Sequence, residues 1–319
     1  MGSEWKVVAP LSTGSIQAVR GPYAGPVDPV RATRYVTPLR EGGSLPGLME
    51  ADDLGMYVVK FCGAGQGPRA LVAEVISAEI AGGIGLRVPR WVPVVVPEEM
   101  APAEPDEEVQ HLLRLSAGMN LGIDYLPGAL DVGPMPAVDG QLAGRILWLD
   151  ALIANADRSW RNPNMLVWHR ALQLIDHGAA LTFHHAWAPG RADQVPRFAE
   201  RAYEVADHAL LECTPDVARA DAEMADVDWA PLIAGAVDAV PSEWLEVDSA
   251  AWGGTDSVRA AYREFLTARV GARSSWVPAL VEAVDRGPIR NERGHRISAR
   301  QSPGPPEWIP ELRIGREES

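Results

Sequence analysis

The chain has 319 residues, 47% hydrophobic and 23% charged, which is the composition of an ordinary globular protein. Its formal net charge of −14 would repel phosphate backbones, so the composition argues against direct nucleic-acid binding. Its apolar runs are too short to span a membrane and its two cysteines too few for a disulfide framework, so we expect a cytoplasmic protein.

The first part of the chain is predicted to be rich in β-structure. After an irregular lead-in rich in glycine and proline, turn residues and β-type runs predict strands over residues 34–39, 47–51, 56–61, 91–96 and 119–126. Pro93 suggests that the fourth strand lies at an edge or bends. An apolar stripe that begins at Pro68 and ends at Gly82 and Gly83 predicts one helix. We expect a solvated acidic loop over 97–108 and a short helix around Leu112.

The second part is predicted to be mostly helical. A helix is expected over 141–155, and helical patterns fill most of 197–285, with Thr255 as the N-cap of the last helix. Two short strands, 165–168 and 172–175, form a hairpin between these helices. The predicted organisation is α+β, in four parts: a lead-in, a β-rich unit, a helical unit and a loose polar tail, over residues 1–33, 34–126, 127–288 and 289–319.

Acidic and amide residues cluster around the predicted hairpin. Asp157 is followed five residues later by Asn162, and Asp176 comes directly after the second strand. Phosphoryl transfer needs a carboxylate that faces the incoming hydroxyl, and an amide and a second carboxylate that hold Mg²⁺ over the phosphates. The hairpin would return Asp176 to the loop of Asp157, so the pattern predicts such a site, with Asn164 as an alternative to Asn162.

Lysine is very rare in this chain: of 29 basic residues only Lys6 and Lys60 are lysines. Lys60 lies in the third predicted strand, where a kinase places the lysine that binds the α- and β-phosphates and pairs with a helix glutamate. Glu74 is the better candidate for that glutamate, and Glu79 is the alternative. Gly42, Gly43 and Ser44 lie between the first two strands, where backbone N–H groups could approach phosphates.

These elements occur in the order found in kinases, and the chain resembles the HipA-like kinases. The resemblance covers about residues 34–275 and is strongest in YVVKF, LVAEVISAEIAGGIGLRVP, NADRSWRNPNML and IDHGAAL. It implies a bilobed protein-kinase-like fold with ATP between the lobes. Lys60 would be the phosphate-binding lysine, Asp157 the catalytic base, and Asn162 and Asp176 the metal ligands. Adenine would be recognised by backbone groups of a hinge near Ile123, Asp124, Tyr125 and Leu126.

The sequence departs from the kinase pattern in two places. Asp176 is followed by His177 and Gly178 rather than by Phe-Gly, and no Ala-Pro-Glu motif follows, so conventional activation-loop control is not expected. Some HipA-like kinases carry an additional N-terminal subdomain that contacts an antitoxin, but the residues before Arg34 are too few to form one. Antitoxin binding is therefore not assumed.

Together these features predict an ATP- and Mg²⁺-dependent kinase. Family analogy suggests that the acceptor is a Ser or Thr hydroxyl of a protein or peptide. One alternative is a small-molecule kinase of the aminoglycoside-phosphotransferase type, whose cationic acceptor would suit the acidic surface. Another is a nucleotide-binding pseudokinase that acts as a scaffold.

Overall fold

The computed structural model describes residues 28–39, 45–65, 67–132, 138–290, 296 and 298. The predicted glycine loop at Gly42, Gly43 and Ser44 lies outside these residues, as do most of the predicted lead-in and tail. Over the described part of the chain, no helix is both long enough and apolar enough to span a membrane.

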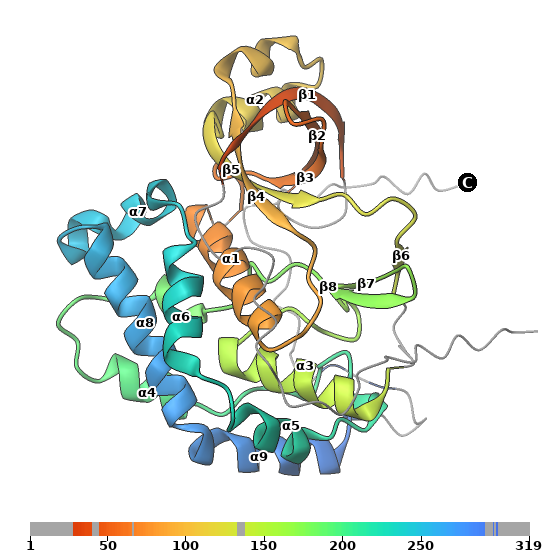
Figure 1. Ribbon diagram of the computed structural model, residues 1–319, viewed down its shortest axis with the longest axis vertical. Coiled ribbons are helices and arrows are strands. Elements are labelled where there is room, and N and C mark those ends of the chain that lie inside the picture. The colour runs from red at the N-terminus through yellow and green to blue at the C-terminus, as the bar shows by residue number, and fades with distance from the viewer. Residues whose placement is uncertain are drawn as a thin grey trace, which may run out of the picture.

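An N-terminal β-barrel is followed by a mostly helical region, an α+β arrangement consistent with a bilobed kinase-like fold (Figure 1). The barrel closes in the order β1-β2-β3-β5-β4, and only the pair of β1 and β4 is parallel. Alternate side chains fill its interior, among them Met49, Val59 and Val94. Its strands are β1 (Val30–Pro38), β2 (Gly47–Ala51), β3 (Met56–Lys60), β4 (Trp91–Val96) and β5 (Gly118–Asp124).

Closure of the barrel changes the expected role of Pro93. β4 is not an edge strand, because it lies between β1 and β5. Its pairing with β1 involves only Val94 and Val95, whereas Pro93 lies opposite Leu121 of β5. The proline therefore precedes the segment of β4 that has neighbours on both sides, where a missing N–H is tolerated.

The prediction of a solvated acidic loop over residues 97–108 is wrong for much of this range. A short 3₁₀ helix, η1 (Glu98–Ala103), and the first residues of α2 (Glu107–Leu115) occupy it. The Asp106 carboxylate caps α2 by accepting hydrogen bonds from the N–H groups of Glu108 and Val109. Acidic residues in the first turn of a helix are favoured by its dipole, so their high density here marks a helix start rather than a solvated loop.

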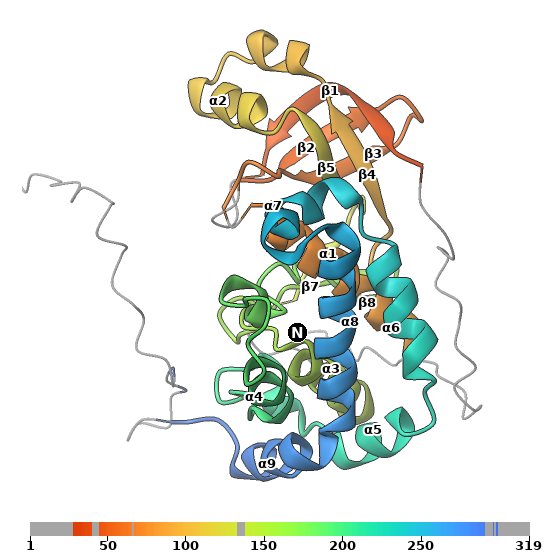
Figure 2. The ribbon, with the colours of Figure 1, turned by 90° about the vertical axis from the view of Figure 1, so that its left-hand side faces the viewer.

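The C-terminal region combines helices with a small sheet (Figures 1 and 2). The predicted hairpin of β7 (Met165–Trp168) and β8 (Ala171–Leu174) gains a third strand, β6 (Leu130–Asp131). The helical elements of this region are α3 (Gly140–Ile153), η2 (Thr182–His185), α4 (Gln194–Glu200), η3 (Leu211–Cys213), α5 (Val217–Met224), α6 (Trp229–Asp238), α7 (Ser242–Trp252), α8 (Thr255–Gly271) and α9 (Arg273–Arg286).

The prediction that Thr255 is the N-cap of the last helix is also wrong. It is the first residue of α8, the cap position is Gly254, and α9 is the last helix of the described residues. Gly254 has a φ of 125°, which favours glycine over threonine at the cap.

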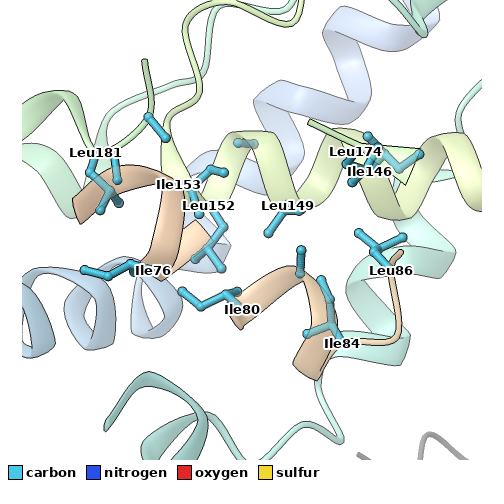
Figure 3. Packing of buried hydrophobic residues seen from close by; sticks show 14 of the residues in the cluster. Ile76, Ile80, Ile84, Leu86, Ile146, Leu149, Leu152, Ile153, Leu174 and Leu181 are labelled. Atoms are coloured by element: carbon cyan, nitrogen blue, oxygen red, sulfur yellow. The ribbon is translucent and has the colours of Figure 1, made fainter. Parts of the chain in front are cut away.

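The helix α1 (Pro68–Gly83) belongs to the β-rich half in sequence but packs into the core of the helical region. Figure 3 shows Ile76 and Ile80 of α1 facing Leu152 and Ile153 of α3. All four side chains are fully buried. Because α1 follows β3 in the chain and lies against α3, it connects the barrel to the helical region.

Helix α3 approaches α5 so closely that Gly144 has no room for a side chain. A Cβ atom at this position would lie 2.3 Å from the carbonyl oxygen of Asp216. By contrast, a Cβ at Gly235 in α6 would meet no atom within 4 Å. The two glycines therefore differ in packing although both lie within helices.

We predict that Gly144→Ala destabilises the protein by about 1–3 kcal/mol, because the methyl group pushes α3 away from the backbone before α5. Gly235→Ala should stabilise it by roughly 0.5–1 kcal/mol through helix propensity alone. Urea unfolding followed by circular dichroism measures both. Equal effects of the two changes would contradict the proposed close approach.

Candidate functional site

Lys60, the last residue of β3, lies where the barrel meets the helical region. Its Nζ contacts Oε1 of Glu74 and lies 2.6 Å from Oδ1 of Asp176. Burial by itself would lower the pKa of Lys60, but the two carboxylates outweigh it and raise the pKa above its ordinary value. Lys60 is therefore a fixed positive charge between α1 and the segment that follows β8.

Glu74, in the middle of α1, is only 4% exposed. Burial would raise the pKa of its carboxyl group, but Lys60 and the neighbouring His177 outweigh burial and lower it. The carboxylate also accepts hydrogen bonds from the N–H groups of His177 (2.9 Å) and Gly178 (2.8 Å). Glu79 instead accepts a hydrogen bond from Nε1 of Trp91. Of the two glutamates considered from the sequence, the structure places Glu74 against Lys60.

Asp176 is held in a left-handed conformation, with a φ of 57°. Such conformations are uncommon outside glycine and concentrate where the surroundings impose them. Here the two following N–H groups are bound by Glu74, and a Cβ at Gly178 would lie 3.2 Å from Oε1 of Glu74. These contacts leave the Asp176 side chain 47% exposed, next to Lys60.

Asp157 lies in the loop between α3 and β7, with both predicted asparagines. Nδ2 of Asn162 and Nδ2 of Asn164 donate to the same carboxylate oxygen, Oδ2, at 3.0 and 3.2 Å. Burial raises the pKa of Asp157 and the charge of Asp176 raises it further, whereas the hydrogen bonds from the two amides oppose the shift. Asn162 is exposed and Asn164 buried, so Asn162 is the more accessible amide.

A buried ionic network under this loop was not predicted from the sequence. Asp150 of α3 is completely buried, and its Oδ2 accepts hydrogen bonds from Nε of Arg158 (2.6 Å) and Nε2 of His208 (3.0 Å). Burial would raise the pKa of Asp150, but Arg158 and His208 outweigh it and lower the pKa. Nη1 of Arg158 donates to the backbone carbonyl of Asn164, at 2.5 Å. The network therefore fixes the loop that carries Asp157.

His177 connects this network to Glu74. Nη2 of Arg158 lies 3.0 Å from Nε2 of His177. Because a guanidinium group can only donate, Nε2 must accept, and the ring proton is on Nδ1. Nδ1 lies 3.8 Å from Oε2 of Glu74. His177 thus lies between α1 and the Asp157 loop.

A cleft between the barrel and the helical region is lined by Glu74 and Asp176, the two partners of Lys60. Glu74, Asp176 and His177 form its polar side. Apolar side chains from both regions form the remaining wall, among them Trp91, Leu121, Ile123 and Ile175. An apolar wall next to a few charged groups is typical of small-molecule sites.

The predicted hinge residues lie at the end of β5. The side chain of Ile123 lines the cleft. The N–H groups of Asp124 and Tyr125, however, donate to the carbonyl groups of Arg90 (2.7 Å) and Met56 (3.0 Å). In this conformation both donors are used inside the barrel, so they do not face a ligand.

The available metal donors are hard oxygen atoms. The side-chain nitrogen atoms of Asn162 and Asn164 bind Asp157, which leaves each amide oxygen for another partner, and Asp176 supplies a half-exposed carboxylate. Among the described residues, no three His, Cys, Asp or Glu side chains form a cluster that could hold a metal. This donor set fits Mg²⁺, which is commonly bound by one or two carboxylates together with water and phosphate.

We predict that Asp150→Asn destabilises the protein by about 3–5 kcal/mol, because it leaves Arg158 buried without its counter-ion. The matched control is Asp238→Asn, which removes the exposed partner of Arg263 and should cost at most about 1 kcal/mol. Chemical denaturation of both variants measures the difference. If Asp150→Asn costs no more than the control, the buried network does not hold the loop.

A family model described as HipA-like kinase matches residues 33–276, which is more than half of the chain. No curated protein matches the chain. The matched range begins in β1, ends in α9 and includes Lys60, Glu74, Asp157 and Asp176. The chain therefore belongs to the HipA-like kinase family.

Proposed function

We propose that this protein is an ATP- and Mg²⁺-dependent kinase of bilobed fold that transfers the γ-phosphoryl group to a hydroxyl. The family supports phosphotransfer in general. The observation that carries the proposal is the contact of Lys60 Nζ with both Glu74 and Asp176, which joins β3, α1 and the segment after β8. Phosphoryl transfer needs a cation that binds the phosphates and a carboxylate that holds the metal, and Lys60 and Asp176 can supply them.

Lys60 is proposed to bind the α- and β-phosphates of ATP. Its raised pKa keeps it protonated at neutral pH, and its ammonium group is held by Glu74 and Asp176, both of which line the cleft. The adenine ring would lie against the apolar wall that contains Ile123, close to Asp124 and Tyr125. Gly42, Gly43 and Ser44 do not belong to the described residues; their backbone N–H groups are proposed to approach the phosphates.

Asp157 is proposed to orient the acceptor hydroxyl and to take its proton. The hydroxyl oxygen forms a bond to the γ-phosphorus, the bond from that phosphorus to the β,γ-bridging oxygen breaks, and ADP leaves. The raised pKa of Asp157 makes it a stronger base than an ordinary aspartate. The two asparagines fix one of its carboxylate oxygens, which limits rotation of the side chain.

Asn162 and Asp176 are proposed to hold Mg²⁺, with Asn164 as the alternative amide ligand. Bound there, the ion would neutralise charge on the phosphate oxygens. Lys60 adjoins Asp176, so its positive charge lies on the same side of the site.

The acceptor is proposed to be a Ser or Thr hydroxyl of a protein or peptide. A second pocket is lined by Asp157 and by two other acidic residues, Glu204 and Asp207. These acidic groups also support the second candidate, a cationic small-molecule acceptor, since opposite charges attract. Binding of an antitoxin is not part of the proposal.

We predict that Asp157→Asn lowers phosphotransfer about 10²–10⁴-fold while ATP binding is retained, because the substitution removes the base but no phosphate contact. Transfer of labelled γ-phosphate from ATP to a Ser/Thr peptide array measures the rate. Asp226→Asn, an exposed aspartate after α5, is the control and should remain fully active. Undiminished transfer by Asp157→Asn would overturn the assignment of the base.

ATP at ~100 times its Kd should stabilise the protein by roughly 2.7 kcal/mol in the presence of Mg²⁺. We predict that Asp176→Asn loses the metal-dependent part of this shift, because it removes one of the two proposed ligand side chains. Thermal melting with ATP, with and without Mg²⁺, measures the shift for each protein against its own ligand-free melt. No shift with any nucleotide would contradict the kinase proposal, and a shift without phosphotransfer or hydrolysis would indicate a pseudokinase.

A further inference from the structure

The pocket beside Asp157 is formed by two stretches of chain, residues 156–161 and 203–208, together with Ser298. It is separate from the cleft next to Lys60. Its lining includes Asp157, Ser159 and Arg161 from one loop, Glu204 and Asp207 from the chain before η3, and Ser298. A segment distant in sequence from the catalytic loop therefore reaches the side of Asp157 where an acceptor would bind.

Backbone hydrogen bonds fix the two stretches relative to each other. The N–H of Trp160 donates to the carbonyl group of Asp207, at 2.9 Å, and the N–H of Ala209 donates to that of Arg158, at 3.1 Å. Ser159 and His208 form an isolated antiparallel bridge. The pocket is therefore held open by the main chain and does not depend on the conformation of one side chain.

Arg296 does not line the pocket but is anchored next to it, on the backbone around Asp207 and His208. Its Nη2 donates to the carbonyl oxygens of Ala206 (3.1 Å) and His208 (2.8 Å), and its guanidinium carbon lies 5.7 Å from the centre of a Trp160 ring. Burial lowers the pKa of Arg296, and the carboxylates of Glu212 and Asp207 partly offset this by favouring its positive charge. Carbonyl groups, an aromatic ring and two anions together form a site for an arginine side chain.

Ser298, two residues further on, places a hydroxyl group in the pocket. Its Oγ donates to Oδ2 of Asp207. A hydroxyl group has only one hydrogen to donate. Because Ser298 donates its hydrogen to Asp207, it does not donate to Asp157. Ser298 thus lies in the pocket and Arg296 next to it, as the serine and the arginine of an acceptor peptide could, but the Ser298 hydroxyl donates to Asp207 rather than to the proposed base.

We propose that the pocket beside Asp157, together with the adjoining surface of Trp160, Ala206 and His208, binds a peptide in which an arginine precedes a hydroxyl residue by two positions. Arg296 and Ser298 of the chain itself occupy this surface as an internal competitor. The proposal deepens the proposed kinase function by naming the class of acceptor. Only the role of Asp157 as base rests on that function; the docking of the segment rests on the contacts of Arg296 and Ser298.

The test is binding of a fluorescent peptide with the sequence of residues 290–302 to the full-length protein, measured by anisotropy without nucleotide. An internal competitor at an effective concentration of ~1 mM, with a Kd of ~0.1 mM, weakens binding about tenfold. We therefore expect the Arg296→Ala protein to bind the peptide about tenfold more tightly than the wild-type protein. The Arg286→Ala protein, which changes an exposed arginine of α9, should bind like wild type.

A second peptide separates specific docking from attraction of a basic peptide to an acidic protein. The same peptide with Arg296→Ala keeps its other arginines and should bind the Arg296→Ala protein at least tenfold more weakly. Ser298→Ala in the protein removes only the hydrogen bond to Asp207, so it tests the competitor without loss of the arginine anchor and should tighten peptide binding by a smaller factor.

The proposal is overturned if the Arg296→Ala and Ser298→Ala proteins bind the peptide no better than wild type, or if the peptide lacking this arginine binds equally well. Failure of the kinase proposal has a different signature, because the binding experiment contains no nucleotide. Peptide docking without any phosphotransfer would leave the pocket assignment intact and remove only the catalytic role of Asp157.

Discussion

The rest of the site depends on the contacts made by the buried carboxylate of Glu74. It binds Lys60 from the barrel and the N–H groups of His177 and Gly178 from the helical region. An almost fully buried carboxylate is costly unless charge and hydrogen bonds compensate it, and here one ammonium group and two N–H groups do so. The burial of Glu74 therefore requires the lysine and the segment carrying Asp176 to be in place at the same time.

A second buried carboxylate, Asp150, plays the corresponding role for the loop of Asp157. Arg158 connects the two centres, because it binds Asp150 through Nε and His177 through Nη2. The proposed base and the proposed metal ligand are thus positioned by one continuous set of buried polar contacts. Such networks are stable only when every member is paired, so a change at one end is expected to disturb the other.

The sequence predicted those parts of the fold that depend on local pattern. The strands around Lys60, the limits of α1 and the hairpin before Asp176 follow from alternation, helical spacing and turn residues. The spacing of Asp157, Asn162 and Asp176 around the hairpin also predicted that these residues form one site. The inner position of β4 and the third strand, β6, were not predicted, because strand order depends on contacts distant in sequence.

The buried network was missed for a related reason. Asp150 lies within an apolar helix that is buried on nearly all sides, so periodicity does not indicate that its carboxylate meets Arg158 and His208. The signal that could have indicated it is an aspartate inside an otherwise apolar helix, since such a charge needs partners. Family analogy assigned adenine recognition to backbone groups near Ile123 to Leu126 without naming which groups. The pairing of the barrel strands gives the N–H groups of Asp124 and Tyr125 backbone partners.

The position of α1 limits how the site can move. Ile76 and Ile80 pack on α3, and Arg69 at the start of α1 forms a two-pronged pair with Asp248 of α7. Glu74 is therefore fixed to the helical region, while Lys60 belongs to the barrel. Any opening that separates the barrel from α1 must break the contact between these two residues. The cost of exposing the Glu74 carboxylate without Lys60 disfavours such an opening, so a closed cleft and a correctly placed Lys60, the lysine that we propose to bind phosphate, are expected to occur together.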